Sequence, residues 1–292
     1  MREKGLYMKK ELSVKLEKEV LSLVTDITFS CVPDWYNSIF TDLKMNLIIP
    51  KHRENHKGMP AILWLCGGAY SVVSNSAWMP ELMYFARKGF VVASAEYRTS
   101  NKATFPAGII DVKAAIRYLK AHADQFCIDP SKIFVMGESA GGTYACLAGV
   151  TDKMKEWDQG DHLHVDSSVA GVVDFYGPVN IEESPVAKKE NVPSWVTVAF
   201  LGEDSYDENA KSASAVNYID QDSSPFLILH GTGDTTVPIA QSDELYEKLK
   251  EHNVYTEYYK IKDAEHGEDS FYQEEVKEIV YSFLKKICDE IS

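Results

Sequence analysis

Residues 135–142, Val-Met-Gly-Glu-Ser-Ala-Gly-Gly, are the stretch on which the predicted fold depends. They follow a short apolar run at 133–135 and lead into a helical pattern at 143–150, which indicates a strand, a sharp turn and a helix. Ser139 between two glycines matches the G-x-S-x-G nucleophile elbow, in which the serine hydroxyl is exposed at the tip of the turn. Such a hydroxyl can attack a carbonyl once a base takes its proton. A glycine-rich turn with an idle serine is the alternative, so other motifs must decide.

A second motif follows the continuous apolar run at 60–65, which is typical of a central strand buried on both faces. The strand ends in Cys-Gly-Gly-Ala-Tyr at 66–70. In serine hydrolases with this elbow, the loop at this point supplies backbone N–H groups to the oxyanion hole. Cys66 replaces the usual histidine of the H-G-G-G version, which removes no N–H donor. We therefore predict an oxyanion hole formed by the N–H groups of Gly68, Ala69 and Ala140.

From residue 60 onward, strand patterns alternate with helix patterns. The helices are predicted at 77–88, 106–123, 143–150, 239–252 and 270–291, and the later strands at 90–95, 133–135, 170–176, 225–230 and 254–261. This alternation is typical of an α/β fold with a mostly parallel central sheet and helices on both faces. Before it, the apolar segments 25–31 and 43–49 indicate a hairpin at the edge of the sheet, joined by a turn at 33–37.

An acid and a histidine follow the last two predicted strands. Asp234 lies in a Gly-Thr-Gly-Asp loop, and His266 follows the final strand. Because the carboxyl ends of parallel strands meet at one edge of a sheet, both are expected to lie near Ser139. His266 would take the serine proton, and Asp234 would orient the imidazole and stabilise its charged form. Asp263 and Asp174 are alternative acids, but the compact loop favours Asp234.

Composition narrows the choice of partners. The chain has 30 basic and 44 acidic residues, a net charge of −14, which disfavours nucleic acid and anionic membranes. Its five cysteines have no C-x-x-C spacing, so neither a disulfide framework nor a zinc site is indicated. His162 and His164 could bind a metal, but solvated loops carry such residues freely, and we expect no metal and no cofactor. Without an apolar segment of signal-peptide or membrane-span length, a cytoplasmic protein is expected, and a secreted protein given without its signal is the alternative.

The expected organisation is an N-terminal helical extension at 1–24 and a single catalytic domain at 25–292. The extension places Leu12, Leu16, Val20 and Leu23 at helical spacing. Residues 179–217 interrupt the strand and helix alternation and predict a small lid or pocket wall, too short for a deep acyl tunnel. Aromatic residues that could line the substrate pocket, or instead pack in the core, are Tyr70, Trp78, Tyr176 and Trp195.

From about residue 25 to its end, the chain resembles the α/β-hydrolase esterases. It is most similar to the bifunctional feruloyl and acetyl xylan esterases, a subgroup related to the prolyl-oligopeptidase-type and hormone-sensitive-lipase-type hydrolases. The stretches that carry the resemblance are 77–98, 105–119, 137–142, 174–178, 230–238 and 265–267, of which 78–98 is typical of the subgroup. The resemblance implies a serine ester hydrolase that cleaves acetyl or feruloyl-type esters, plausibly those of plant polysaccharides.

Two other functions are compatible with these motifs. A peptidase of the prolyl-oligopeptidase type is disfavoured because such enzymes typically add a propeller domain, and no such repeat is present. A catalytically idle binding protein on the same fold usually lacks a triad member, and here Ser139, Asp234 and His266 are all present. The expected partner is a small-molecule or oligosaccharide ester.

Overall fold

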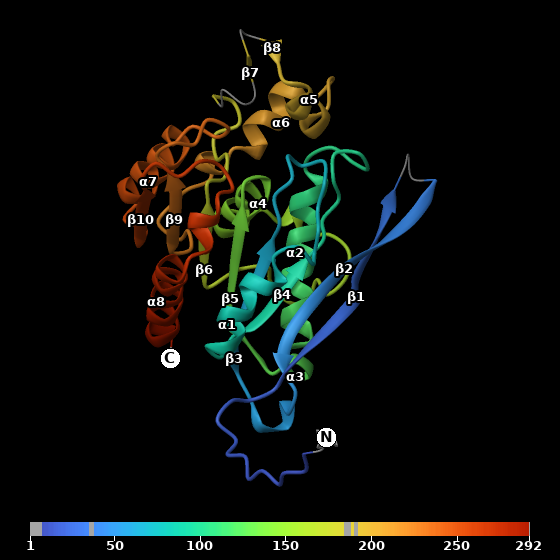
Figure 1. Ribbon diagram of the computed structural model, residues 1–292. Helices are drawn as coiled ribbons and strands as arrows, with labels where there is room; N and C mark the ends of the chain where they lie inside the picture. Colours follow the sequence, from blue (N-terminus) through green and yellow to red (C-terminus); the bar gives the residue numbers. More distant parts are fainter. Residues whose placement is uncertain (1–7, 35–37, 184–187, 190–191, 292) are drawn as a thin grey trace, which may run out of the picture.

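A sheet of eight strands forms the centre of the protein in the computed structural model, which describes residues 8–34, 38–183, 188–189 and 192–291 (Figure 1). The strand order across the sheet is β1-β2-β4-β3-β5-β6-β9-β10. The strands are β1 (Leu21–Asp34), β2 (Ile39–Pro50), β3 (Met59–Leu65), β4 (Val91–Ala95), β5 (Ile128–Glu138), β6 (Gly171–Phe175), β9 (Phe226–Gly231) and β10 (Thr256–Ile261).

The strand directions confirm the predicted mostly parallel sheet. From β4 to β10 all neighbouring strands run parallel, whereas β2 is antiparallel to both β1 and β4. The predicted edge hairpin is therefore confirmed as β1 and β2, although both strands are longer than the apolar segments indicated. Of the turn predicted at 33–37, residues 35–37 lie outside the described part of the chain.

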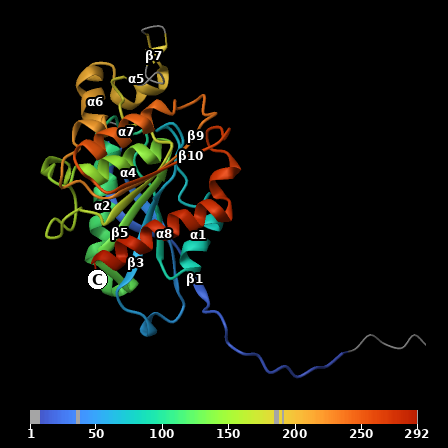
Figure 2. The same ribbon diagram turned by 90° about the vertical axis from the view of Figure 1, so that its left-hand side faces the viewer.

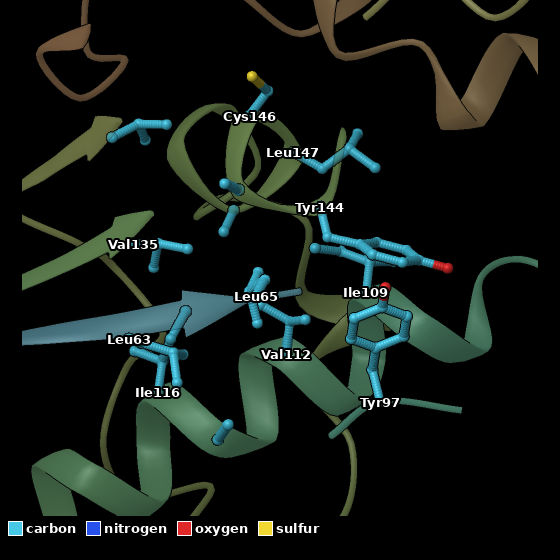
Figure 3. Close-up of a cluster of buried hydrophobic side chains, with 14 of the residues drawn as sticks. Leu63, Leu65, Tyr97, Ile109, Val112, Ile116, Val135, Tyr144, Cys146 and Leu147 are labelled. Atoms are coloured by element: carbon cyan, nitrogen blue, oxygen red, sulfur yellow. The ribbon is translucent and has the colours of Figure 1, made fainter. Parts of the chain in front are cut away.

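Side chains of β3 alternate between the two faces of the sheet, as the period of a strand requires. Leu63 and Leu65 face the core layer that contains Ile109 and Val112 of α2 (Ala107–Ala121) and Tyr144 of α4 (Ala140–Val150), and Figure 3 shows this cluster. The short helix α3 (Ala123–Phe126) and the helix α7 (Ala240–Glu251) complete this layer. This face is thus covered over most of the parallel sheet.

The opposite face of the sheet is covered by two helices from distant parts of the chain. Ile62 and Trp64 of β3 face α1 (Met79–Arg87) and α8 (Glu274–Ile291), and Figure 2 shows these two helices side by side. The helices predicted on both faces are confirmed. Within the described residues, no helix is long and apolar enough to span a membrane.

The prediction of a helix within the N-terminal extension is wrong. Residues 8–20 contain no helix, and 21–24 belong to strand β1. In Figure 2 this segment leads away from the body, and Leu12 and Leu16 are 78% and 92% exposed. An amphipathic segment of this length is only marginally helical unless its apolar face is packed, and here Leu12 and Leu16 of that face remain largely exposed.

The predicted lid region contains two short helices, α5 (Trp195–Leu201) and α6 (Tyr206–Ala213), which lie above α4 in Figure 1. Two-residue strands, β7 (Lys188–Lys189) and β8 (Val192–Pro193), precede them. Residues 184–187 and 190–191 of the predicted lid lie outside the described part of the chain. Short 3-10 helices at Arg53–Asn55, Lys155–Trp157, Ala215–Asn217 and Asp269–Tyr272 complete the structure.

Candidate active site

Ser139 stands at a sharp turn between β5 and α4. Its backbone has φ 53° and ψ −121°, a conformation that residues other than glycine rarely adopt. The turn is held by the Ser139 N–H, which donates to the Phe175 carbonyl over 2.9 Å. A Cβ at Gly141 would lie 2.0 Å from the Leu65 carbonyl oxygen, so only glycine allows α4 to pack this close to β3. These features are those of the predicted nucleophile elbow.

The structure brings the three predicted triad residues into one hydrogen-bonded chain. His266 Nε2 lies 2.8 Å from Ser139 Oγ, and His266 Nδ1 lies 2.7 Å from Asp234 Oδ2. A carboxylate oxygen can only accept, so Nδ1 carries the hydrogen and Nε2 is left to accept from the serine hydroxyl. Of the two alternative acids, Asp263 has a side chain that is 83% exposed and Asp174 bonds to the Gly177 N–H instead.

The carboxylate of Asp234 is completely buried and fully hydrogen-bonded. Oδ1 accepts the N–H groups of Thr236 and Val237, each over 2.8 Å. Burial by itself would raise the pKa of Asp234, but hydrogen bonds from His230, His266 and Val237 outweigh it and hold the pKa well below its usual value. Asp234 is therefore a carboxylate that can orient His266 and stabilise its protonated form.

The three predicted oxyanion donors lie on two neighbouring segments. Ala140 is the first residue of α4, where a backbone N–H has no acceptor within the helix. Gly68 and Ala69 have φ values of 142° and 51° and form a turn in which the Gly68 carbonyl accepts from Ser71 and Val72. Both residues are exposed, so the turn is accessible at the edge of the sheet where Ser139 lies.

Glu138 is a site residue that the sequence analysis missed. Its buried carboxylate accepts from the Gly67 N–H over 2.8 Å, the Trp78 indole over 3.0 Å and the Tyr176 hydroxyl over 3.4 Å. It thus ties the nucleophile turn to the loop that carries Gly68 and Ala69. The signal in the sequence was its position directly before Ser139, but only the fold shows which donors surround it.

Cys66 lies against the same carboxylate. Its Sγ is 3.8 Å from Glu138 Oε1, and the side chain is buried. Burial is the larger cause and the nearby charge of Glu138 the smaller one, and together they raise the pKa of the Cys66 thiol to about 11. Cys66 is therefore protonated at neutral pH and serves as a small packed residue.

The four predicted pocket aromatics occupy different environments. Tyr70 and Tyr176 are buried, Trp78 is half-buried, and Trp195 is 73% exposed. Tyr70 stacks on Phe200 of α5 with ring centroids 3.8 Å apart, and its hydroxyl bonds to Thr143. Tyr176 meets the His266 ring edge-on at 4.7 Å. Of the four, only Trp195 is exposed as the rim of a pocket requires. Tyr70 and Tyr176 pack behind the site, in agreement with the alternative that they belong to the core.

The histidines that could have bound a metal lie together away from this site. His162 is next to His122 and His164, with ring centroids 5.1 and 6.0 Å away. Across residues 8–34, 38–183, 188–189 and 192–291, no group of three or more His, Cys, Asp or Glu side chains is arranged to hold a metal ion.

Asp174 allows a test of how the interior beneath the elbow responds to pH. Its carboxyl is fully buried, and burial raises its pKa to about 7. Between the ordinary value of about 3.9 and 7, the folded protein holds a proton that the unfolded chain releases, so this group lowers stability as pH rises. We expect the Asp174→Asn variant to lose this contribution, which amounts to about 4 kcal/mol across the window.

The measurement is the free energy of unfolding in urea at pH 5 and pH 8. Asp174→Asn should gain stability relative to wild type as the pH rises, whereas the exposed control Asp263→Asn should follow wild type. Equal pH dependence in all three proteins would contradict a raised pKa at Asp174.

Comparison with protein families identifies the chain. The family model named BD-FAE matches residues 45–249, which is well over half of the protein. The chain belongs to the BD-FAE family. The matched segment of this BD-FAE protein includes the serine turn, the Gly68 loop and Asp234, and it ends before His266. The predicted resemblance to the α/β-hydrolase esterases is thereby confirmed.

Two curated relatives of this BD-FAE protein come from Mycobacterium tuberculosis. Esterase LipC is 29% identical over 197 residues, covering 66% of this chain and 49% of LipC. The probable carboxylic ester hydrolase LipM is 30% identical over 212 residues, covering 68% of this chain and 47% of LipM. The chain thus spans about half the length of these relatives.

Solved structures support the same fold. A truncated carbohydrate esterase from gut microbiota superposes with a TM-score of 0.76 at 27% identity, covering 94% of this BD-FAE chain and 98% of that one. The bifunctional GH43-CE protein of Bacteroides eggerthii gives a TM-score of 0.77 at 26% identity, covering 91% of this chain and 38% of that chain. The α/β-hydrolase fold predicted from the sequence is confirmed.

Proposed function

We propose that this protein is a serine carboxylic ester hydrolase that acts through Ser139, His266 and Asp234. The observation that carries the proposal is the continuous hydrogen-bonded chain from Ser139 Oγ through both nitrogens of His266 to the buried Asp234 carboxylate. The names of the relatives support it, since LipC and LipM are both named as ester hydrolases.

The proposed reaction has two halves. In the first, Ser139 Oγ attacks the ester carbonyl while His266 Nε2 takes the hydroxyl proton, and the N–H groups of Gly68, Ala69 and Ala140 stabilise the oxyanion. The tetrahedral intermediate then collapses, His266 returns the proton to the leaving alcohol, and an acyl-serine remains. In the second half, water attacks the acyl-serine with His266 again as base, which releases the acid and regenerates Ser139.

The proposed substrates are acetyl or feruloyl-type esters of plant polysaccharides. The carbohydrate esterase from gut microbiota supports a sugar alcohol as the leaving group. The packing of α5 supports a small acyl group, because Phe200 stacks directly on the buried Tyr70 behind the Gly68 loop and leaves no deep space between α5 and this loop. Exposed Trp195, at the start of α5, offers an aromatic face to a sugar or phenolic ring.

A series of p-nitrophenyl esters from C2 to C12 tests the acyl preference. We expect kcat/KM to be highest for acetyl to butyryl esters and to fall steeply by octanoyl. Each methylene without an apolar wall forgoes up to about 0.8 kcal/mol of binding. The assays are run below micelle-forming concentrations, together with acetylated xylan, methyl ferulate and an aminopeptidase substrate. A maximum at C8 or longer would indicate a lipase-like pocket, and faster amide cleavage would favour the peptidase.

A further inference from the structure

The carboxylate of Asp234 touches a second imidazole besides that of His266. His230 Nε2 lies 3.4 Å from Asp234 Oδ2, the oxygen that also accepts from His266 Nδ1. The side chains of His230 and Asp234 are both 0% exposed. The proposed reaction gives His230 no part, so its place beside the triad acid calls for an explanation.

Hydrogen bonds define the orientation of the His230 ring. Its Nε2 lies 2.9 Å from the Val237 carbonyl oxygen, and its Nδ1 lies 2.7 Å from Ser242 Oγ. A carbonyl oxygen only accepts, so in the neutral ring Nε2 carries the hydrogen and Nδ1 accepts from the serine hydroxyl. The Nε2–H is therefore shared between the Val237 carbonyl and the Asp234 carboxylate, and a flip of the ring would break both contacts.

The ring joins three parts of the fold at the point where the triad acid is held. His230 is in β9, Ser242 is in α7, and Val237 belongs to the loop between them, which also carries Asp234. Val237 is bound twice, because its carbonyl accepts from His230 and its N–H donates to Asp234 Oδ1. His230 thereby fixes both the loop and the carboxylate on it.

We propose that His230 is a positioning residue of the active site, which holds the Asp234 carboxylate in the orientation that aligns His266 with Ser139. The kinetic test of this inference rests on the proposed function, whereas the test by proton resonance does not. Without the His230 Nε2–H, Oδ2 loses one of two donors and the Val237 carbonyl loses its partner, so the carboxylate can rotate away from His266. Misalignment of the base affects the chemical step more than substrate binding, so kcat should fall and KM should change little.

Other groups that face these two imidazoles also affect the pH dependence of kcat. Asp174 of β6 lies within electrostatic range of His230, and the centroid of the Tyr176 ring lies 6.5 Å from that of His230 and 4.7 Å from that of His266. Asp234 and Ser139 are hydrogen-bonded to the His266 ring itself. Since Asp174 titrates with a raised pKa, the pH profiles are also measured in an Asp174→Asn background, and only a shift that persists there counts for the proposal.

The test compares His230→Gln with His230→Leu, using p-nitrophenyl acetate and active-site titration with a fluorophosphonate. Gln presents an N–H at about the reach of Nε2, so its kcat should stay within about threefold of wild type. Leu fills similar volume without a donor, so its kcat per titrated site should fall about 10- to 100-fold with KM within about twofold. The acid limb of the kcat profile should move in Leu and not in Gln.

A readout independent of turnover is the downfield proton resonance expected for the His266 Nδ1–H bonded to Asp234, assigned by its loss in Asp234→Asn. It should persist in His230→Gln and shift or broaden in His230→Leu. If His230→Leu does not fold, His230→Asn, whose amide is too short to reach Val237, takes its place. The matched control is His122→Leu, outside the site. An unchanged resonance and unchanged kcat in folded His230→Leu or His230→Asn would overturn the proposal. An inactive wild type would instead contradict the proposed esterase function and leave the positioning role of His230 to be judged by the resonance.

Discussion

The Ser139→Ala variant should lose ester turnover almost completely, with kcat/KM for p-nitrophenyl acetate reduced by at least about 10⁴-fold. Alanine keeps the elbow but removes the hydroxyl that His266 Nε2 contacts at the end of the hydrogen-bonded chain from Asp234. What remains is direct attack by water, with the proposed N–H donors still stabilising the oxyanion of the intermediate. The variant should still fold, because the substitution removes only a half-buried hydroxyl and no packed apolar group. Equal turnover by wild type and variant would remove Ser139 as the nucleophile.

The acid of the triad can be tested with a control from the neighbouring loop. Asp234→Asn should lower kcat/KM by about 10³- to 10⁴-fold, because an amide cannot keep the His266 tautomer in place. Asp263→Asn changes the same chemical group three residues before His266, but its side chain is largely exposed. Its turnover should match wild type. Comparable losses in both variants would show that the assignment of the acid is wrong.

The Gly68→Ala variant should lose about 10²- to 10³-fold in kcat, the effect typical of removing an oxyanion donor. Gly68 has φ 142°, and a Cβ there would lie 2.2 Å from the carbonyl oxygen of Val72. Both the strain and the clash with backbone force the loop to shift, which moves the N–H groups of residues 68 and 69. KM should change much less, because the ester still reaches Ser139. Steady-state kinetics over a range of p-nitrophenyl acetate concentrations separates the two parameters.

Gly89 provides a matched control for this substitution. Its φ is 99°, but a Cβ there would meet no atom within 4 Å. Gly89→Ala therefore introduces backbone strain without a clash, at a position after α1 that is outside the site. It should lower the free energy of unfolding and leave kcat unchanged. If Gly68→Ala keeps wild-type kcat, the oxyanion hole does not include this loop.

The central architecture could be predicted because its signals are local. The run at 60–65 is apolar throughout, and the turn at 137–141 needs glycines for close packing, so the strand β3 and the elbow follow from the residues themselves. The meeting of Ser139, Asp234 and His266 then follows from topology, because each lies in the segment that follows a parallel strand, at the same edge of the sheet.

The missed features depend on what a segment meets in space. Residues 9–24 have helical periodicity, but periodicity becomes a helix only where an apolar face finds a partner. Glutamate is usually a surface residue, yet the fold surrounds Glu138 with hydrogen-bond donors from Gly67, Trp78 and Tyr176. Tyr70 has the character of a pocket aromatic, and only its contact with Phe200 places it behind the site.

The stack of Tyr70 on Phe200 has a consequence for behaviour on heating. It joins the loop of the proposed oxyanion hole to α5, a helix of seven residues in which the Phe200 carbonyl also accepts from the Phe105 N–H. Short peripheral helices open at lower free-energy cost than a central sheet. We expect activity to fade at a temperature below that of the far-ultraviolet circular dichroism transition, and to return on cooling. Coincidence of the two transitions would mean that α5 melts only with the whole protein.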